Sequence, residues 1–525
     1  MRSVSQNPLA GIRRKSPVQR REFPDADYAR DVLAPEAARA EELLGASVID
    51  VYRAHVVQLA EQRVVEPSVA GRALARLEEP LPGGGGSLAL PLSGLDEGVV
   101  AATSPELALG QSAEERLIAA TRMVLRREVL DLAVALVDLR VAAAELAGQH
   151  LTTLVLATEH GQIVQPTSLG HYLAAQLGPL ARATTRLVEA YARVNRSPLG
   201  AVSGMATAMP VRRQQTADWL GFDGLIDNTF DAIAATDDLT EIASVVAGTA
   251  VELSRLVNDL NYWARDDVGL IVPGDEYVHH VRIQPQRRDP LVLEHLRLSL
   301  AAQAASPQAL VTQLVGRQML GTMSSRLAAT FAVVELLRDA RASYRLLARV
   351  LSTLAVHRSM VAHRSHRGFS TSSELADLLA IDFRFPADQA RSLAERVVLE
   401  WTESGGEATT LTSEFIDEVA LREVGREGGI EPEPLAKCLS PKRFVERRDV
   451  PGGPAPAAVT AQLDRATFSV NHDRGWQRER VQALADARER LDARCRALAA
   501  DPAGALRHQA PRPSGEGSDG KIGDI

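Results

Sequence analysis

Apolar residues recur at helical spacing over long stretches of this chain. One stripe between residues 242 and 260 consists of Ile242, Val245, Val246, Leu253, Leu256, Val257 and Leu260. Steps of three and four residues place such side chains on one face of an α-helix. The segments 113–150, 169–196, 291–303 and 308–355 have similar spacing, and several are long enough to span the molecule. We therefore expect long helices that pack side by side in a bundle.

Shorter elements flank this predicted bundle. Residues 28–77 predict two or three short helices, and the proline- and glycine-rich segment 80–87 ends them as a loop. Near residue 368 the pattern changes to shorter helices. A turn-rich link at 443–456 then precedes a final charged helix at 476–499.

These changes divide the chain into five segments. They are a disordered basic arm at 1–27, an N-terminal helical domain at 28–112, a central long-helix bundle at 113–365, a C-terminal helical domain at 366–500 and a disordered tail at 501–525. The arm has no apolar segment behind its arginines, so we expect no signal peptide and a cytoplasmic protein. Proline, glycine, serine and aspartate dominate the tail, which is typical of disorder.

Composition supports this picture and excludes several classes of protein. Of 525 residues, 45% are hydrophobic but only 4% aromatic, which favours an all-α fold with aliphatic packing over strands. The net charge of -8 provides no basic field for nucleic acid or an anionic membrane. No stretch approaches the roughly 20 apolar residues of a membrane helix. Cys438 and Cys495 are too few and too isolated for a disulfide framework, and they fit a reducing compartment.

A polar loop at 275–290 carries the most informative motif. It reads Asp-Glu-Tyr-Val-His-His-Val-Arg-Ile-Gln-Pro-Gln-Arg-Arg-Asp-Pro and resembles the signature D-E-F-S-T-G-S-S-x-M-P-Q-K-K-N-P of the argininosuccinate lyase and fumarase family. Val281 and Arg282 stand where that family has its two serines. Arg287 stands at its first lysine and Asp289 at its asparagine. The frame of the loop is kept, while the reactive serine is absent.

Further motifs in the same order extend the resemblance over about residues 28–498. Residues 159–171 resemble T-H-L-Q-x-A-Q-P-x-T-x-G-H and retain His160, Gln165 and His171. The other matches are S-P-L-G at 197–200, L-G-F-D-G at 220–224, N-S-x-D-A at 228–232, G-F-S-T-A-x-D-L at 368–378 and G-G-T-A-P at 451–456.

The resemblance implies a mainly helical, three-part subunit of the fumarase and aspartase type. It implies a homotetramer around a central twenty-helix bundle, with each active site shared between three subunits. The implied chemistry is a β-elimination that releases fumarate from a succinyl-amine or related adduct. Such a reaction passes through a carboxylate-stabilised carbanion, which needs cationic and N–H donors where the charge develops.

Four residues are candidates for proton transfer. His160 matches the family's histidine, and an imidazole exchanges protons near neutral pH, although a single histidine is often structural. Glu159 replaces the family's threonine and would orient His160 or act as a base; a solvated acid at the end of a helix is the alternative. His279 and His280 would supply a relocated base, or they are polar residues of a relaxed loop.

Six residues are candidates for substrate binding: Ser112, Glu114, Gln165, Arg282, Arg287 and Asp289. The family's S-R-N-D run appears here as Ser112-Ala113-Glu114-Glu115, so an arginine and an asparagine are replaced by Ala113 and Glu114. Arg287 keeps a positive charge, although guanidinium and ammonium groups bind a carboxylate in different geometries. We expect Arg287 to face an anion.

No motif assigns a metal or a cofactor. His357, His363 and His366 lack acidic neighbours at metal-ligand spacing. The glycines at 83–86 are not followed by the Gly-Lys-Ser/Thr of a phosphate-binding loop.

Three functions remain open on these residues. The first is a divergent carbon–nitrogen lyase, re-specialised for another small carboxylate-bearing substrate of the kind found in specialised metabolism, and acting by elimination or reverse addition. The second is a catalytically silent homologue that serves as a scaffold or regulatory subunit. The third, housekeeping argininosuccinate lyase, is disfavoured because each lost oriented donor typically lowers the rate ~10²-fold or more.

Overall fold

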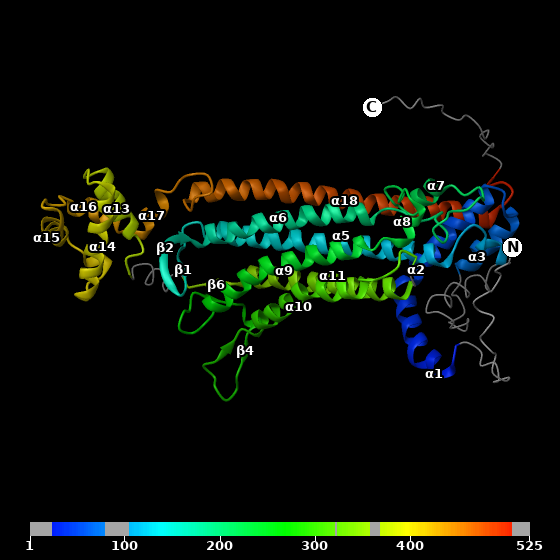
Figure 1. Ribbon diagram of the computed structural model, residues 1–525, viewed down its shortest axis with the longest axis horizontal. Helices are drawn as coiled ribbons and strands as arrows, with labels where there is room; N and C mark the ends of the chain where they lie inside the picture. The colour runs from blue at the N-terminus through cyan, green and yellow to red at the C-terminus, as the bar shows by residue number, and fades with distance from the viewer. Residues whose placement is uncertain (1–23, 79–103, 321–322, 358–367, 507–525) are drawn as a thin grey trace, which may run out of the picture.

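The structure, a computed structural model, describes residues 24–78, 104–320, 323–357 and 368–506. It is mainly α-helical, as the sequence predicts, and its long helices run along one axis of an elongated molecule (Figure 1). The predicted glycine-rich loop, His363 and His366 lie outside the described residues, as do most of the basic arm and of the tail.

In the described part of the chain, seven long helices build the body: α2 (Ala34–Glu61), α5 (Ala113–Gln149), α6 (Leu169–Val194), α9 (Asp237–Trp263), α10 (Leu291–Leu314), α11 (Met323–Thr353) and α18 (Pro456–Ala500). α5 packs against α2, α6, α11 and α18, while α9 packs against α6, α10 and α11. Leucine, valine and alanine side chains of α5, α6, α9, α10 and α11 share one core.

Short elements lie at both ends of the body. At one end are α1 (Ala26–Tyr28), the π-helical η1 (Ala29–Leu33), α3 (Pro67–Leu77), η2 (Pro105–Ala108), α7 (Arg213–Trp219) and α8 (Thr229–Ala234). At the other are α13 (Ser372–Ile381), α14 (Ala387–Glu403), η4 (Ala408–Thr410), α15 (Ser413–Val424), α16 (Pro432–Cys438) and α17 (Pro441–Glu446). Residues 375–438 form a core of their own; the domain boundaries stay predictions.

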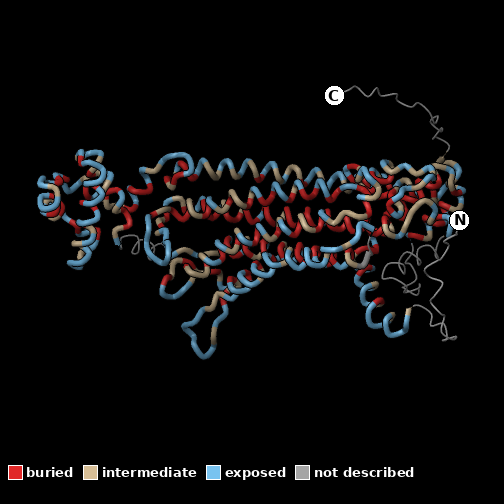
Figure 2. The backbone as a smooth tube through the Cα atoms, viewed as in Figure 1, coloured by how far each residue is buried: buried red, intermediate tan, exposed pale blue. Residues whose placement is uncertain are grey.

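The central position of α5 follows from its sequence. Ser112 caps its N-terminus in a reciprocal capping box with Glu115, which satisfies two backbone N–H groups that the first turn leaves unpaired. Apolar residues then occur on every side of the helix, and a helix of that kind is stable only when other elements surround it. Figure 2 shows this pattern, with burial concentrated along the middle of the body.

Among the residues that the structure describes, three short antiparallel strand pairs complete the fold. β1 (Leu154–Glu159) pairs with β2 (Gln162–Ser168), β3 (Ile271–Val272) with β6 (Ala355–Val356), and β4 (His279–His280) with β5 (Arg288–Asp289). The 3-10 turn η3 (Asp275–Tyr277) precedes β4. Both hairpins carry residues that the sequence singles out as candidates for catalysis.

Several helix boundaries differ from the predicted ones. The pattern predicts a break between 303 and 308, but α10 continues through Pro307 to Leu314. The chain turns instead at Gly316, whose φ of 79° lies in the left-handed region that glycine adopts without steric penalty.

Helices near both ends of the chain are also longer than the sequence pattern predicts. The single 28-residue helix α2 occupies most of the segment where two or three short helices are predicted. α18 begins at Pro456 rather than at residue 476, because proline is compatible with the first turn of a helix. None of the described helices has the length and apolar character that crossing a membrane would require.

Candidate functional site

His160 lies at the tip of the β1–β2 hairpin. Glu159 and Gln162 are the last paired residues, so His160 and Gly161 form a two-residue turn. Both have positive φ, 50° and 75°, as a type I′ turn requires. Positive φ is uncommon for a residue other than glycine. The His160 side chain is 90% exposed and takes no part in the core.

Glu159 is the charged group beside this imidazole. Its Oε1 lies 3.8 Å from His160 Nε2, and the carboxylate is 74% exposed. That distance is too long for a hydrogen bond. The two side chains are therefore free to reorient toward a substrate or a second protein surface.

Gln165 on the same hairpin and His171 in the first turn of α6 have structural partners. Gln165 is exposed, and its Nε2 donates a hydrogen bond to Ser373 Oγ over 3.1 Å. His171 lies 2.8 Å from Thr167 Oγ1 through Nδ1 and 3.0 Å from the Gly452 carbonyl through Nε2. These contacts join β2 and α6 to the start of α13 and to the chain before α18. A substrate-binding role for Gln165 stays a prediction.

The loop at 275–290 forms a second hairpin that projects from the body below β4 in Figure 1. His279 pairs with Asp289 and His280 with Arg288 through the backbone. Successive residues of a strand point to opposite faces, so the two imidazoles lie on opposite sides of this hairpin. Both are exposed, as is Arg282.

Arg287 meets an anion within its own loop. Its Nη2 and Nε lie 2.7 and 3.2 Å from the two carboxylate oxygens of Asp289, and Nη1 donates to Gln284 Oε1 over 2.9 Å. The guanidinium is half exposed, so this pair is screened by water and contributes little to stability. Val281 is half-buried beside them and has no proton to transfer.

The third group of candidates lies at the start of α5. Ser112 Oγ accepts the N–H of Glu115 and donates to the Val202 carbonyl over 2.6 Å. Glu115 is wholly buried, and its Oε2 accepts the N–H of Val202 over 2.7 Å. Burial raises the pKa of Glu114, and the positive charge of Arg317 opposes that rise. Ser112 therefore joins the start of α5 to the segment around Val202, and this region is called the Ser112 corner below. The carboxylate of Glu114 lies near the cation Arg317.

The three groups lie apart within one chain. Ser112 precedes the first residue of α5 and the β1–β2 hairpin follows its last, so the 37 residues of the helix separate them by about 55 Å. Figure 1 shows β1 and β2 at one end of the body and α3 and α8 at the other. Among the described residues, no hydrogen bond or ion pair joins His160, the 275–290 loop and Ser112. A hollow of about 490 Å³ between α9, α10 and α11 contains none of the candidates.

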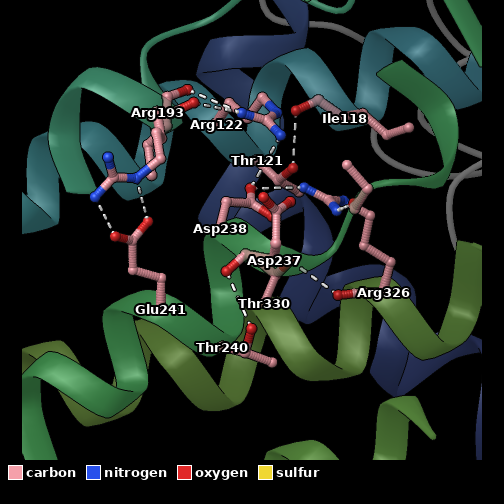
Figure 3. A network of polar contacts seen from close by, with 12 residues as sticks. Ile118, Thr121, Arg122, Arg193, Asp237, Asp238, Thr240, Glu241, Arg326 and Thr330 are labelled. Atoms are coloured by element: carbon pink, nitrogen blue, oxygen red, sulfur yellow. Dashed lines mark hydrogen bonds and ion pairs between the residues drawn. The ribbon is translucent and has the colours of Figure 1, made fainter. Parts of the chain in front are cut away.

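Buried charges near the Ser112 end were not predicted from the sequence (Figure 3). Asp238 Oδ2 lies 2.9 Å from Arg326 Nη2 and 3.4 Å from Arg122 Nη2, and all three side chains are at most 3% exposed. Burial alone would raise the pKa of Asp238, but Arg122 and Arg326 hold it below its ordinary value. In the sequence, Arg122 follows Ile118 by four residues and precedes Leu125 by three, so it shares an apolar helix face with them. That spacing indicates that its guanidinium is buried.

No group of three or more histidine, cysteine, aspartate or glutamate side chains in the described part of the chain is arranged to hold a metal ion. Of the three histidines considered for metal binding, only His357 is described. Its backbone N–H donates to the Leu270 carbonyl over 2.9 Å.

Comparison with known proteins adds independent information. A family model described as a lyase matches residues 86–303. Argininosuccinate lyase of Natronomonas pharaonis is 32% identical over 492 residues, covering 89% of this chain and 97% of that protein. The enzyme of the same name from Methanoculleus marisnigri is 33% identical over 394 residues, covering 75% and 79%. The crystal structure of EDDS lyase in complex with formate superposes with a TM-score of 0.79 at 27% identity, covering 91% of this chain and 98% of that one.

Proposed function

Because the chain belongs to the argininosuccinate lyase family, whose members are carbon–nitrogen lyases, we propose that it catalyses a β-elimination, or the reverse addition, on a small carboxylate-bearing metabolite. The substrate differs from argininosuccinate, since Ala113 and Val281 replace an arginine and a serine of the family motifs. We place the reaction in specialised metabolism.

The observation that carries this proposal is the presentation of His160. Its side chain is 90% exposed, on a backbone with φ of 50°. An unfavourable φ is kept where the surrounding structure holds it, and such residues cluster at functional sites. An imidazole that is exposed at the tip of a hairpin is suited to proton transfer.

Each member of the site then has a distinct task. His160 moves the proton, with Glu159 orienting the ring. The projecting hairpin at 275–290 brings His279, His280 and Arg282 to the substrate. One of its two histidines serves as the second proton-transfer group. The carbanion formed after loss of a Cβ proton is stabilised by fixed cations and N–H donors near its carboxylate.

We further propose that the site forms between copies of the chain in a homotetramer. The β1–β2 hairpin and the Ser112 corner lie about 55 Å apart along α5, too far to act on one small molecule. Apolar side chains on the outer faces of the bundle, such as Leu298 at 56% and Val251 at 47% exposure, are available to pack against a second copy.

Fumarate release tests the proposal. Purified protein would be incubated with argininosuccinate, adenylosuccinate, aspartate, nitrosuccinate and hydrazinosuccinate. We expect release from one of the last four, lowered ~10²- to 10⁴-fold by His160→Ala because general acid–base catalysis contributes about that much.

His160→Asn is the matched control for the shape of the turn, since asparagine tolerates positive φ but transfers no proton. It should be as inactive as His160→Ala while keeping the wild-type melting temperature. Activity retained in both variants would contradict the role given to His160.

A catalytically silent subunit is the second candidate function, and Val281 favours it because an aliphatic side chain cannot replace the serine at any pH. Absence of fumarate release from every compound, with an intact tetramer, would support this alternative.

A further inference from the structure

Arg317 has an unusual environment for an arginine in a surface loop. It lies between α10 and α11, where Val315, Met319 and Leu320 are 74%, 59% and 42% exposed. Arginine normally buries its aliphatic stem and keeps its charged head in water. Here all three guanidinium nitrogens, Nε, Nη1 and Nη2, are buried and have no hydrogen-bond partner among the residues that the structure describes.

The loop that carries Arg317 packs on the Ser112 corner. A Cβ placed at Gly204 would lie 3.2 Å from Leu320 Cδ2, so the loop touches the segment around Gly204. Val202 of the same segment accepts the hydroxyl proton of Ser112 through its carbonyl and donates its N–H to Glu115. The loop, the 199–206 segment and the first turn of α5 thus form one corner of the molecule.

Positive charge exceeds negative charge among the buried groups of this corner. The cations are Arg116, Arg122, Arg317 and Arg326, and the anions are Glu114, Glu115 and Asp238. Asp238 is already paired with Arg122 and Arg326. Arg317 feels the charges of Arg326 and Glu114 but forms a hydrogen bond with neither. Exposed Asp231 and Asp237 act on Arg122 from the surface.

A buried guanidinium without a partner is unfavourable for the folded chain, because its hydration is lost and no hydrogen bond replaces it. Such a group persists where a ligand supplies the missing acceptors. The planar fork of a guanidinium matches the two oxygens of a carboxylate. The N-terminal end of the α5 dipole adds favourable potential for an anion.

From these observations we propose that Arg317 binds a carboxylate of the substrate, in place of the arginine that the family motif has where this chain has Ala113. The cation thus comes from the α10–α11 loop instead of the start of α5. Glu114, whose charge acts on Arg317, competes for it when the site is empty. The inference rests on the proposed function only in identifying the anion as the substrate's carboxylate.

Calorimetric titration of the full-length protein with fumarate tests this assignment. Arg317→Gln should weaken fumarate binding by ~10- to 100-fold, since hydrogen bonds to a charged group are the stronger ones in proteins. Arg317→Lys should retain part of the affinity, because it keeps the charge without the planar fork. Glu114→Gln should tighten binding, since it removes the competing charge.

Arg297→Gln is the matched control. Arg297 lies on α10, is 48% exposed and is paired with Glu294, so its loss changes net charge equally without touching the corner. Fumaramide, a neutral analogue of fumarate, should not bind the wild type. Inorganic phosphate bound as tightly as fumarate, with the same dependence on Arg317, would overturn the assignment to a carboxylate.

Thermal melting separates a binding role from a structural one. Arg317→Gln should keep or raise the melting temperature without ligand, because it removes an unsatisfied buried charge. Equal fumarate affinity in Arg317→Gln and wild type, or a wild type that binds no fumarate, would overturn the inference. If Arg317→Gln weakens fumarate binding but the wild type releases fumarate from no adduct, the inference stands and the proposed reaction fails.

Discussion

Two histidines of this chain show how environment decides the role of a residue. His160 is exposed at a hairpin tip, where we propose that it transfers a proton. His55, on α2, is only 2% exposed, with Nε2 3.0 Å from the Leu109 carbonyl. Burial lowers the pKa of His55 to about 4, although the Leu109 carbonyl opposes this shift. His55 therefore stays neutral in the folded chain at the pH where an exposed imidazole gains a proton.

His55 should make the protein less stable in mild acid. In the unfolded chain the imidazole of His55 is protonated below about pH 6.5, whereas in the folded chain it stays neutral down to about pH 4. The unfolded state is therefore stabilised relative to the folded state as the pH falls through this range. We expect a loss of about 2 kcal/mol in the free energy of unfolding between pH 7 and pH 5 from this group alone. Urea unfolding at the two pH values measures it.

His55→Gln is the comparison for that measurement, because the glutamine amide keeps an N–H donor for Leu109 and does not titrate. The stability of this variant should fall less between pH 7 and pH 5 than that of the wild type. His160→Ala should leave the slope unchanged. Parallel curves for His55→Gln and wild type would show that His55 does not cause the acid sensitivity.

At the scale of elements, buried charge pairs join helices that are distant in sequence. Asp238 at the start of α9 contacts Arg122 of α5 and Arg326 of α11. Arg122 also donates to the carbonyls of Arg193 and Val194 at the end of α6 over 3.0 and 3.2 Å. One carboxylate thus fixes the positions of helices that carry the Ser112 corner.

Asp238→Ala should destabilise the protein by about 3–5 kcal/mol, because removal of one partner leaves buried charge uncompensated. Chemical denaturation gives this value. Asp237→Ala is the matched control, since its exposed side chain lies one residue away and acts through water; we expect less than about 1 kcal/mol there. Equal effects in the two variants would contradict the importance of the buried network.

The length of the elements, by contrast, was only partly predictable. Apolar periodicity located the stripes of α5, α6 and α9, but α10 continues through Pro307 and turns at Gly316 instead. A proline inside a helix is tolerated where neighbouring helices stabilise the segment, and periodicity contains no information about those neighbours. The sequence likewise did not predict that His160 lies in a β-hairpin.

At the scale of the whole molecule, the proposed site requires more than one copy of the chain. The β1–β2 hairpin, the projecting hairpin at 275–290 and the Ser112 corner come from different places along an elongated body (Figure 1). A symmetric oligomer brings such separate surfaces together, because each contact is repeated in every copy.

Mixing two inactive variants tests this arrangement. If His160 and Arg317 of one site come from different copies, co-expressed His160→Ala and Arg317→Gln chains should form about a quarter of wild-type sites, since each residue is intact with a probability of one half. Fumarate release by the mixture, compared with each variant alone, measures the recovery. A mixture as inactive as its components would show that both residues act from the same copy.

The sequence by itself determined the mainly helical fold, the stripes of the central helices and, through ordered motifs, the family of the chain. These features depend on residues that are neighbours along the chain or that match a known order. Only the tertiary structure decided that Asp238 meets Arg122 and Arg326 and that the guanidinium of Arg317 is buried without a partner among the described residues. It also decided that a 37-residue helix separates Ser112 from the hairpin of His160. Burial and charge pairing arise from contacts between distant segments, and local periodicity does not specify them.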